Sequence, residues 1–196
     1  MHAFVEAVGQ HRTAGGGFTL IELMTVVAIA AILLTLGVPA MSEFVADQRV
    51  RTTASDIVAE IAFARAKAIE NSRPVYIEKT GALWSNGWRI YVDLDRSGDM
   101  GLGEELKRFD GFPPTGTMYL CIVTNGATDP TANLIFRPDG RLVRNAAQPN
   151  DGIYVVDTMG DTGSSARNKI RGLLFGLSGR VTTVKMNGEA APCIAS

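Results

Sequence analysis

The chain has 196 residues, of which 46% are hydrophobic and 20% are charged, and its formal net charge is −1 at pH 7. This length and composition fit one globular domain with an attached anchor, so no second domain is required. A net charge so close to zero excludes attraction of the whole molecule to polyanions, and any nucleic-acid site must be local.

The first predicted element is an apolar segment near the N-terminus. Residues 23–42 contain no ionisable side chain, and about 20 apolar helical residues suffice to cross the hydrocarbon core of a bilayer. In a secretory signal peptide the small residues of the cleavage site follow the apolar core, whereas here the glycines that end at Gly17 precede it. Cleavage after Gly17 would therefore remove only a polar leader, residues 1–17, and leave residues 18–42 as a transmembrane helix.

Glu22 is the one acidic side chain in this apolar run. A carboxylate inside a membrane is costly, so such a residue is a candidate functional site. One interpretation places Glu22 one turn from the helix start, where the helix dipole favours an anion and the side chain reaches the lipid headgroups. The other interpretation pairs Glu22 with the new amino group of Phe18, on the same subunit or on a neighbouring one.

The motif GFTLIEL, from Gly17 to Leu23, resembles the class III signal of type IV pilins and type II secretion pseudopilins. In that family a prepilin peptidase cuts after the glycine and methylates the new terminal phenylalanine, and the glutamate at the fifth mature position guides subunit docking. The resemblance therefore implies that Gly17 and Phe18 are the cleavage and methylation sites and that Glu22 is the assembly residue.

The same resemblance implies where the chain works and with what. It places the leader inside and the bulk of the chain in the periplasm, with a single pass through the inner membrane, before the subunit enters a pilus or pseudopilus. The implied partners are other minor and major pilins or pseudopilins, the prepilin peptidase and the assembly platform of the inner membrane.

The next predicted element continues the helix over residues 43–72. Small and aliphatic residues recur at spacings of three and four, which is typical of one helix face, and Pro74 disfavours helical geometry at Arg73. The apolar stripe comprises Val50, Ala54, Ile57, Ile61, Ala64 and Ala68. We expect the charged residues of the opposite face to be solvated, namely Arg49, Arg51, Asp56, Glu60, Arg65, Lys67 and Glu70.

Residues 73–196 are predicted to form a β-rich head, because short β-like runs alternate with Gly, Pro, Asn and Asp. The best hairpin turn is 177–180, in which Gly179 can adopt a positive φ, followed by the turn at 138–140. The predicted strands are 75–78, 87–92, 105–109, 118–123, 133–136, 141–144, 152–156, 172–177 and 180–186. A long helix packed by its apolar stripe on a mainly antiparallel sheet gives an α+β fold of the pilin-like kind.

The head also resembles the GspH and FimT/FimU branch of this family. Two blocks carry the resemblance: WRIYVD at 88–93, followed by an acidic turn, and IFRPDGR at 135–141. It implies a minor pilin or pseudopilin that primes or caps a type IV pilus-type filament. The alternatives are a GspH-like subunit of the type II secretion pseudopilus and a FimT-like pilin that binds DNA for natural transformation.

Cys121 and Cys193 are the two cysteines, and both belong to the part expected to face the oxidising periplasm, where disulfides persist. A bridge between them would close a loop of about 70 residues and, in the chain-entropy model, contribute roughly 4 kcal/mol of stability. The alternative is a pair of buried free thiols.

The acidic segment 93–104 fits the pattern of a calcium-binding loop, with oxygen ligands at positions one, three and five, glycine at six and glutamate at twelve. Helices flank such a loop in an EF-hand, whereas β-like runs flank it here. A weak structural Ca²⁺ site and a solvated acidic connection are therefore both open, and no other cofactor is expected. The candidate ligands are Asp93, Asp95, Ser97, Asp99 and Glu104.

Basic side chains outnumber acidic ones in residues 132–186, so any DNA site should lie there. The FimT relatives that capture DNA carry a Gly-Arg-x-Arg pattern near the C-terminus, and here Thr182 stands at the second arginine position after Gly179 and Arg180. The alternative is ordinary surface arginine. The candidate DNA-binding residues are Arg141, Arg144, Arg180 and Lys185.

An enzymatic function is not expected. Both histidines, His2 and His11, lie in the leader, so the mature chain would have no imidazole for acid–base catalysis or zinc binding. We expect Trp84 and Trp88 to pack in the core or on a sheet face instead of forming a ligand platform.

Overall fold

The structure is a computed structural model, and it describes residues 17–113, 116–124, 127–129, 132–143, 151–158, 169–176 and 178–186. The chain divides into two compact units, residues 1–40 and residues 41–196. The second unit therefore includes the later part of the long helix together with the strands, and it is the unit that contains the core.

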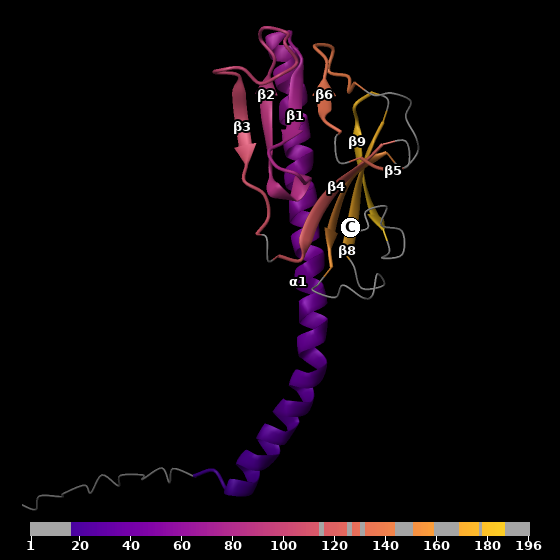
Figure 1. The fold of residues 1–196 in the computed structure, drawn as a ribbon. Coiled ribbons are helices and arrows are strands. Elements are labelled where there is room, and N and C mark those ends of the chain that lie inside the picture. The colour runs from indigo at the N-terminus through magenta and orange to yellow at the C-terminus, as the bar shows by residue number, and fades with distance from the viewer. Residues whose placement is uncertain are drawn as a thin grey trace, which may run out of the picture. The chain divides into compact units, whose positions relative to one another are not determined.

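The helix α1 spans Leu20–Asn71 (Figure 1). It ends where Ser72 takes a φ of 52°, while the N–H of Ser72 bonds to the carbonyl of Ile69 and the N–H of Arg73 bonds to that of Ala68. A residue in the left-handed conformation, followed by a hydrogen bond from the next N–H back to a carbonyl five residues earlier, is a common way for a helix to end. The end predicted from Pro74 is confirmed to within one residue.

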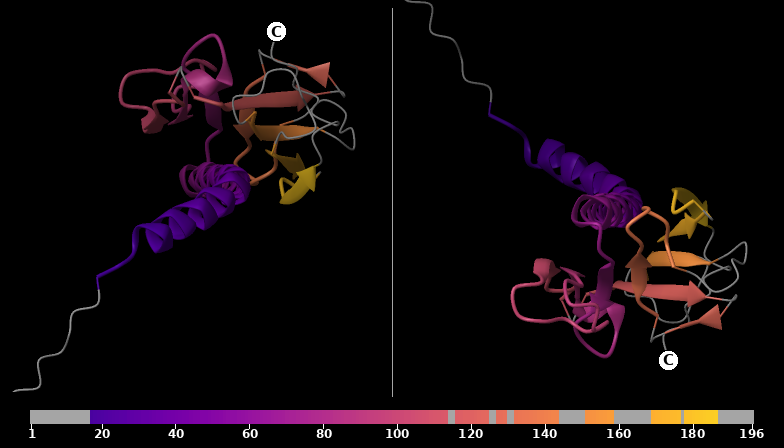
Figure 2. Two further views of the ribbon diagram at one scale, coloured as in Figure 1. Left: turned by 90° about the horizontal axis from the view of Figure 1, so that it is seen from below. Right: turned by 90° about the horizontal axis from the view of Figure 1, so that it is seen from above.

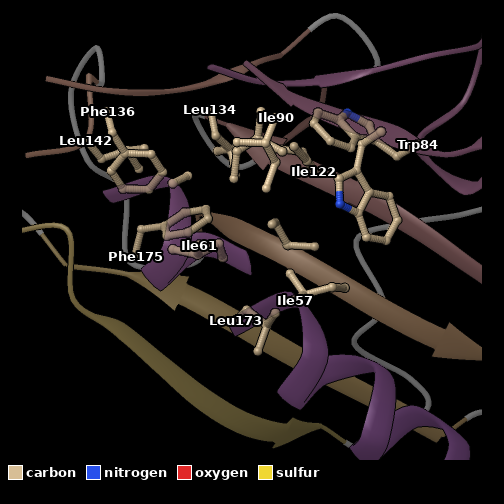
Figure 3. Packing of buried hydrophobic residues seen from close by; sticks show 14 of the residues in the cluster. Ile57, Ile61, Trp84, Ile90, Ile122, Leu134, Phe136, Leu142, Leu173 and Phe175 are labelled. Atoms are coloured by element: carbon tan, nitrogen blue, oxygen red, sulfur yellow. The ribbon is translucent and has the colours of Figure 1, made fainter. Parts of the chain in front are cut away.

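The predicted apolar stripe is confirmed, because all six of its residues are buried at 0–4% exposure and belong to the main hydrophobic core. Figure 3 shows Ile57 and Ile61 of α1 among the core side chains of the head, which include Leu173 and Phe175. Burying an aliphatic side chain of this size contributes about 2 kcal/mol. The second part of α1 is therefore an integral part of the head.

In the part of the head that the structure describes, the strands form two antiparallel sheets, with strand orders β3-β2-β1-β6 and β5-β4-β7-β8-β9. In Figure 2 the magenta strands of the first sheet and the orange and yellow strands of the second lie on different sides of the helix. The strands are β1 Val75–Lys79, β2 Trp88–Val92, β3 Glu105–Phe109, β4 Met118–Thr124, β5 Ala127–Thr128, β6 Leu134–Phe136, β7 Gly152–Asp157, β8 Lys169–Phe175 and β9 Val181–Met186, and a 3₁₀ turn, η1, spans Trp84–Asn86.

Seven of the predicted strands begin and end within one residue of the observed ones. The predicted hairpin turn between β8 and β9 is also confirmed, because Gly179 has a φ of 76° and the N–H of Gly176 bonds to the carbonyl of Arg180 at 2.8 Å. The α+β class and the antiparallel pairing agree with the expected fold.

Two strand predictions are wrong. In the predicted strand 141–144 only Leu142 pairs, as an isolated bridge with Phe136, and Arg144 lies outside the described residues. The predicted strand 172–177 instead begins at Lys169, because β8 pairs along the whole of β7 up to Asp157. The bounds of β8 depend on its pairing with β7, which a local pattern cannot reveal.

The central strand β7 is buried along its whole length. Ile153 and Val155 belong to the main core beneath α1, whereas Tyr154 and Val156 belong to a second buried cluster. Successive side chains of a strand point to opposite faces, so both faces of the second sheet are covered at β7.

Candidate functional site

The predicted assembly region lies at the start of α1. The Oγ1 atom of Thr19 accepts a hydrogen bond from the N–H of Glu22 at 3.3 Å, and the carbonyl of Thr19 accepts one from the N–H of Leu23 at 3.1 Å. Thr19 is thus the N-cap, and Glu22 lies in the first turn, where the helix dipole stabilises an anion. Our sequence-based prediction did not include Thr19, although a threonine three residues before a glutamate is a known capping pattern.

The described large apolar side chains of the first unit are exposed. Phe18 is 83% exposed, and those from Leu20 to Val38 are more than half exposed. The hydroxyl of Thr25 donates to the carbonyl of Ile21 at 2.9 Å and is thus satisfied within the helix. An exposed apolar surface of this kind is typical of a segment that enters lipid or packs against other chains.

Within the described ranges, no helix meets the length and hydropathy that crossing a membrane would require. The assignment of residues 18–42 as a transmembrane helix stays a prediction. The leader, apart from Gly17, lies outside the described residues.

Glu60 of α1 is buried, which corrects the expectation that this helix face is solvated throughout. Its Oε2 atom accepts a hydrogen bond from the indole Nε1 of Trp88 on β2, and its Oε1 atom lies 3.0 Å from Nζ of Lys107 on β3. A buried carboxylate is tolerated because each oxygen has a donor.

Trp84 and Trp88 are both buried, so their predicted place in the core is confirmed.

Ion pairs also join α1 to the second sheet: Glu43 to Lys169 at 3.2 Å, Asp47 to Arg171 at 3.3 Å and Arg49 to Asp157 at 3.2 Å. The strand residues of these pairs belong to β7 and β8. The side chain of Asp157 is fully buried, so its charge depends on a basic partner. The charged face of α1 therefore contacts the sheet at these positions, which fixes the helix against the head.

The pKa of Asp47 reports on this contact. Burial alone would raise it, but a hydrogen bond from Arg51 at 2.9 Å and the charges of Arg171 and Lys185 lower it below the ordinary value of 3.8. Because the folded-state pKa lies below the unfolded one, the ionised carboxylate stabilises the fold above the unfolded-state pKa, and this stability is lost as the pH falls through the folded-state pKa.

We therefore expect Asp47→Asn to lower the free energy of unfolding by about 1 kcal/mol or less near neutral pH. The difference from the wild type should vanish below the folded-state pKa, where both side chains are uncharged. Urea unfolding of the full chain at several pH values, followed by tryptophan fluorescence, measures this. Asp56→Asn, which changes an exposed carboxylate of the same helix, should show no such pH dependence, and an equal loss in both variants would contradict the assignment.

The loop between β2 and β3 brings three of the five predicted calcium ligands together. One oxygen from each of Asp93, Asp95 and Glu104 lies within 4.8 Å of the others. Asp93 and Glu104 are 2% and 3% exposed, whereas Asp95 is exposed. Asp99 lies outside this group, and the hydroxyl of Ser97 donates to the carbonyl of Asp99 at 3.0 Å.

Backbone N–H groups hold the two buried carboxylates of this loop. Glu104 accepts hydrogen bonds from the N–H of Leu94 at 2.8 Å and from that of Gly101, one on each oxygen. Asp93 accepts one from the N–H of Gly98 on Oδ2 at 3.2 Å, while its Oδ1 atom is buried and has no hydrogen-bond partner. Hydrogen bonds from Ser97 lower the pKa of Asp95, so this exposed carboxyl is ionised at neutral pH.

Two stacked tyrosines lie beside the loop. The rings of Tyr76 and Tyr91 are 5.0 Å apart, and the hydroxyl of Tyr91 donates to the carbonyl of Gly98 at 3.1 Å. Burial and the negative charges of Asp93 and Asp99 raise the pKa of Tyr76, and burial together with the charge of Glu78 raises that of Tyr91. Both phenols therefore stay protonated, so Tyr91 remains a donor to the loop.

The predicted DNA-binding residues lie partly together. A Cβ atom on Gly179 would be 3.9 Å from Cα of Arg141, so the turn that carries Arg180 lies next to Arg141. Arg141 pairs with Asp139 at 3.9 Å, and the charge of Lys185 acts on Asp47. Carboxylates thus lie near two of the three described candidates and offset part of their positive charge. The charge distribution at these residues therefore does not favour DNA binding over the other functions.

Cys121 of β4 is disulfide-bonded and packs against the second buried cluster. Cys193 lies outside the described residues. The pairing of Cys121 with Cys193 therefore stays a prediction.

Two regions of the chain match known protein families. The prokaryotic N-terminal methylation motif matches residues 13–38, which include Gly17, Phe18 and Glu22. Together with the long helix and the antiparallel head, this motif defines the chain as a subunit of the pilin and pseudopilin class. The family described as type II transport protein GspH matches residues 53–172, so the chain belongs to the GspH family.

Two solved structures are similar in fold, both of the type IV minor pilin FimU of Pseudomonas aeruginosa (strain PAO1). The crystal structure in space group P2₁ has a TM-score of 0.47 at 18% identity, covering 74% of this chain and 94% of that chain. The one in space group P6₅ has a TM-score of 0.43 at 18% identity, covering 71% and 94%. No curated protein matches the chain. The family assignment rests on the match to the GspH family and on the N-terminal methylation motif. It makes the chain a minor pilin or pseudopilin that interacts with other pilins in a filament.

Proposed function

We propose that the chain is cut after Gly17, methylated at Phe18 and then primes or caps a type IV pilus-type filament. The observation that carries this proposal is the position of Glu22, in the first turn of a helix whose large apolar side chains are exposed over the methylation motif. Before assembly residues 18–42 lie in the inner membrane with the head in the periplasm. The specific partners are the prepilin peptidase, the inner-membrane assembly platform, and the minor and major pilins.

The chemistry of the helix start supports this order of events. Cleavage creates a positively charged amine at Phe18, four residues before Glu22, in a region that is otherwise apolar. In lipid an isolated carboxylate is costly, and pairing it with an amine removes part of that cost. The same ion pair can form between two subunits, with Glu22 of one and the terminal amine of Phe18 of the other. This pairing then sets the axial position of one helix relative to its neighbour.

A pseudopilus of type II secretion is the second candidate, and the description of the matched family favours it. The two candidates share the maturation step and the helix packing, and they differ only in the subunits that surround the head. Cross-linking followed by mass spectrometry would identify those subunits as pilins or as pseudopilins.

The maturation step is tested on the native protein. We expect the chain recovered from the envelope to begin at N-methylated Phe18, and we expect a minor amount of it in filaments sheared from the cell surface or in overproduced pseudopili. Intact-mass measurement and quantitative immunoblotting against the major subunit check both points. A native chain that begins at Met1 contradicts the proposal, and an amount equal to the major subunit contradicts the priming or capping role.

A further inference from the structure

We propose that the loop between β2 and β3 binds one Ca²⁺ ion through Asp93, Asp95 and Glu104. One oxygen of each residue lies within 4.8 Å of the others, and this distance allows the three to contact a common cation. The site lies within the head and does not depend on the proposed filament role.

Asp93 is the observation that distinguishes this loop from an ordinary acidic turn. The residue is 98% buried, since 2% of its surface is exposed, and its Oδ1 atom has no hydrogen-bond partner. A buried carboxylate oxygen without a partner is costly, and native structures satisfy such atoms with a protein group, a water or an ion. The carboxylates of Asp95 and Glu104 lie beside that of Asp93. A bound cation would therefore satisfy the Oδ1 atom and also reduce the repulsion among the three carboxylates.

Two of the buried carboxylates elsewhere in the described part of the head have basic partners. Glu60 pairs with Lys107 at 3.0 Å, and Asp157 pairs with Arg49 at 3.2 Å. Within the described ranges no salt bridge joins Asp93, Asp95 or Glu104 to a lysine or arginine. Residues 93–104 contain Asp93, Asp95, Asp99 and Glu104 against Arg96 alone, so the loop concentrates negative charge.

Backbone N–H groups of the loop hold the two buried carboxylates in place. Each oxygen of Glu104 accepts one backbone N–H, which fixes the group and leaves a second lone pair on each oxygen. Gly98 at the sixth position of the loop has a φ of 82°, the kind of sharp turn that calcium loops require there. Because Asp95 is exposed, an ion can enter from solvent.

The donor set favours calcium over magnesium. Ca²⁺ accepts several carboxylate and carbonyl oxygens in an irregular arrangement, whereas Mg²⁺ demands near-octahedral geometry and keeps much of its water. Three carboxylates on a loop between strands, one of them exposed, match the weaker calcium sites of extracellular modules, whose Kd is about 10⁻⁴–10⁻³ M.

The full chain, purified in detergent and stripped with a chelator, tests the proposal by calorimetric titration with CaCl₂ and by thermal unfolding. We expect one Ca²⁺ per chain and, at about a hundredfold excess over Kd, a rise in Tm of roughly 5–10 °C. No binding up to about ten times the upper end of the Kd range would mean that a water satisfies Asp93, and it overturns the proposal. An equal rise with MgCl₂ overturns the calcium assignment.

Matched variants locate the site. Asp95→Asn changes an exposed side chain and should leave the fold intact, yet it should weaken Ca²⁺ binding by about tenfold or more because one charged ligand is lost. Asp99→Asn removes the same charge from the same loop outside the ligand group and should leave the affinity within about twofold. An equal effect of both variants would point to the charge of the loop as a whole and contradict the three-residue site.

Discussion

Replacing Glu22 by Ala should leave leader cleavage unchanged and reduce incorporation of the subunit into filaments by at least about tenfold. The proposed cleavage after Gly17 lies outside the helix, which begins at Leu20, whereas Glu22 supplies the one negative charge of the apolar segment. Without it the amine of Phe18 enters the filament unpaired, and a buried unpaired charge costs several kcal/mol. Intact mass reports the cleavage, and immunoblotting of the sheared filament fraction reports the incorporation.

Two controls separate charge from helix stability and from processing. Thr19→Ala removes the hydroxyl that caps the helix at 3.3 Å from the N–H of Glu22 but keeps the carboxylate, so it should cost about 1 kcal/mol of helix stability and retain most incorporation. Gly17→Ala should keep the leader attached and block assembly at an earlier step. Loss of incorporation in Thr19→Ala equal to that in Glu22→Ala would show that the helix start, and not the charge, decides docking.

The sequence predicted most successfully those features that depend on local spacing. The stripe that includes Ile57 and Ile61 is buried as expected, because residues three and four apart in a helix share one face wherever that face is covered. Gly179 marks the β8–β9 turn, because few other residues adopt its positive φ. The end of α1 follows from the restriction that Pro74 imposes on the residue before it.

Features that depend on distant contacts escaped prediction. The division of the strands into two sheets depends on which strands pair, for example β1 with β6 and β4 with β7, and periodicity carries no information on this choice. Glu60 looked like a surface residue because it is charged and lies off the predicted apolar stripe, while its two partners lie on β2 and β3. In the acidic loop the residue spacing marked five candidate ligands, but it could not show that only Asp93, Asp95 and Glu104 lie together or which of them are buried.

Replacing Glu60 by Ala should lower the free energy of unfolding by about 3 kcal/mol. The substitution leaves the buried indole N–H of Trp88 without an acceptor, and it opens space beside Ile57, Trp84 and Leu120, which line a small internal cavity together with Glu60. Lys107 loses its partner as well, but its side chain is half-exposed and can turn to water. Most of the loss therefore comes from the indole and the packing.

Urea unfolding of the full chain in detergent measures this loss, and tryptophan fluorescence is a direct probe because Trp84 and Trp88 are the two tryptophans of the chain. Glu60→Gln keeps the shape and an acceptor for the indole N–H, so it should lose only about 1 kcal/mol. Glu70→Ala breaks an exposed pair with Lys67 on the same helix and should change stability by about 0.5 kcal/mol or less. If Glu60→Ala were no more destabilising than Glu70→Ala, the carboxylate would not join the helix to the first sheet, and the contact of α1 with that sheet would depend on its apolar stripe alone.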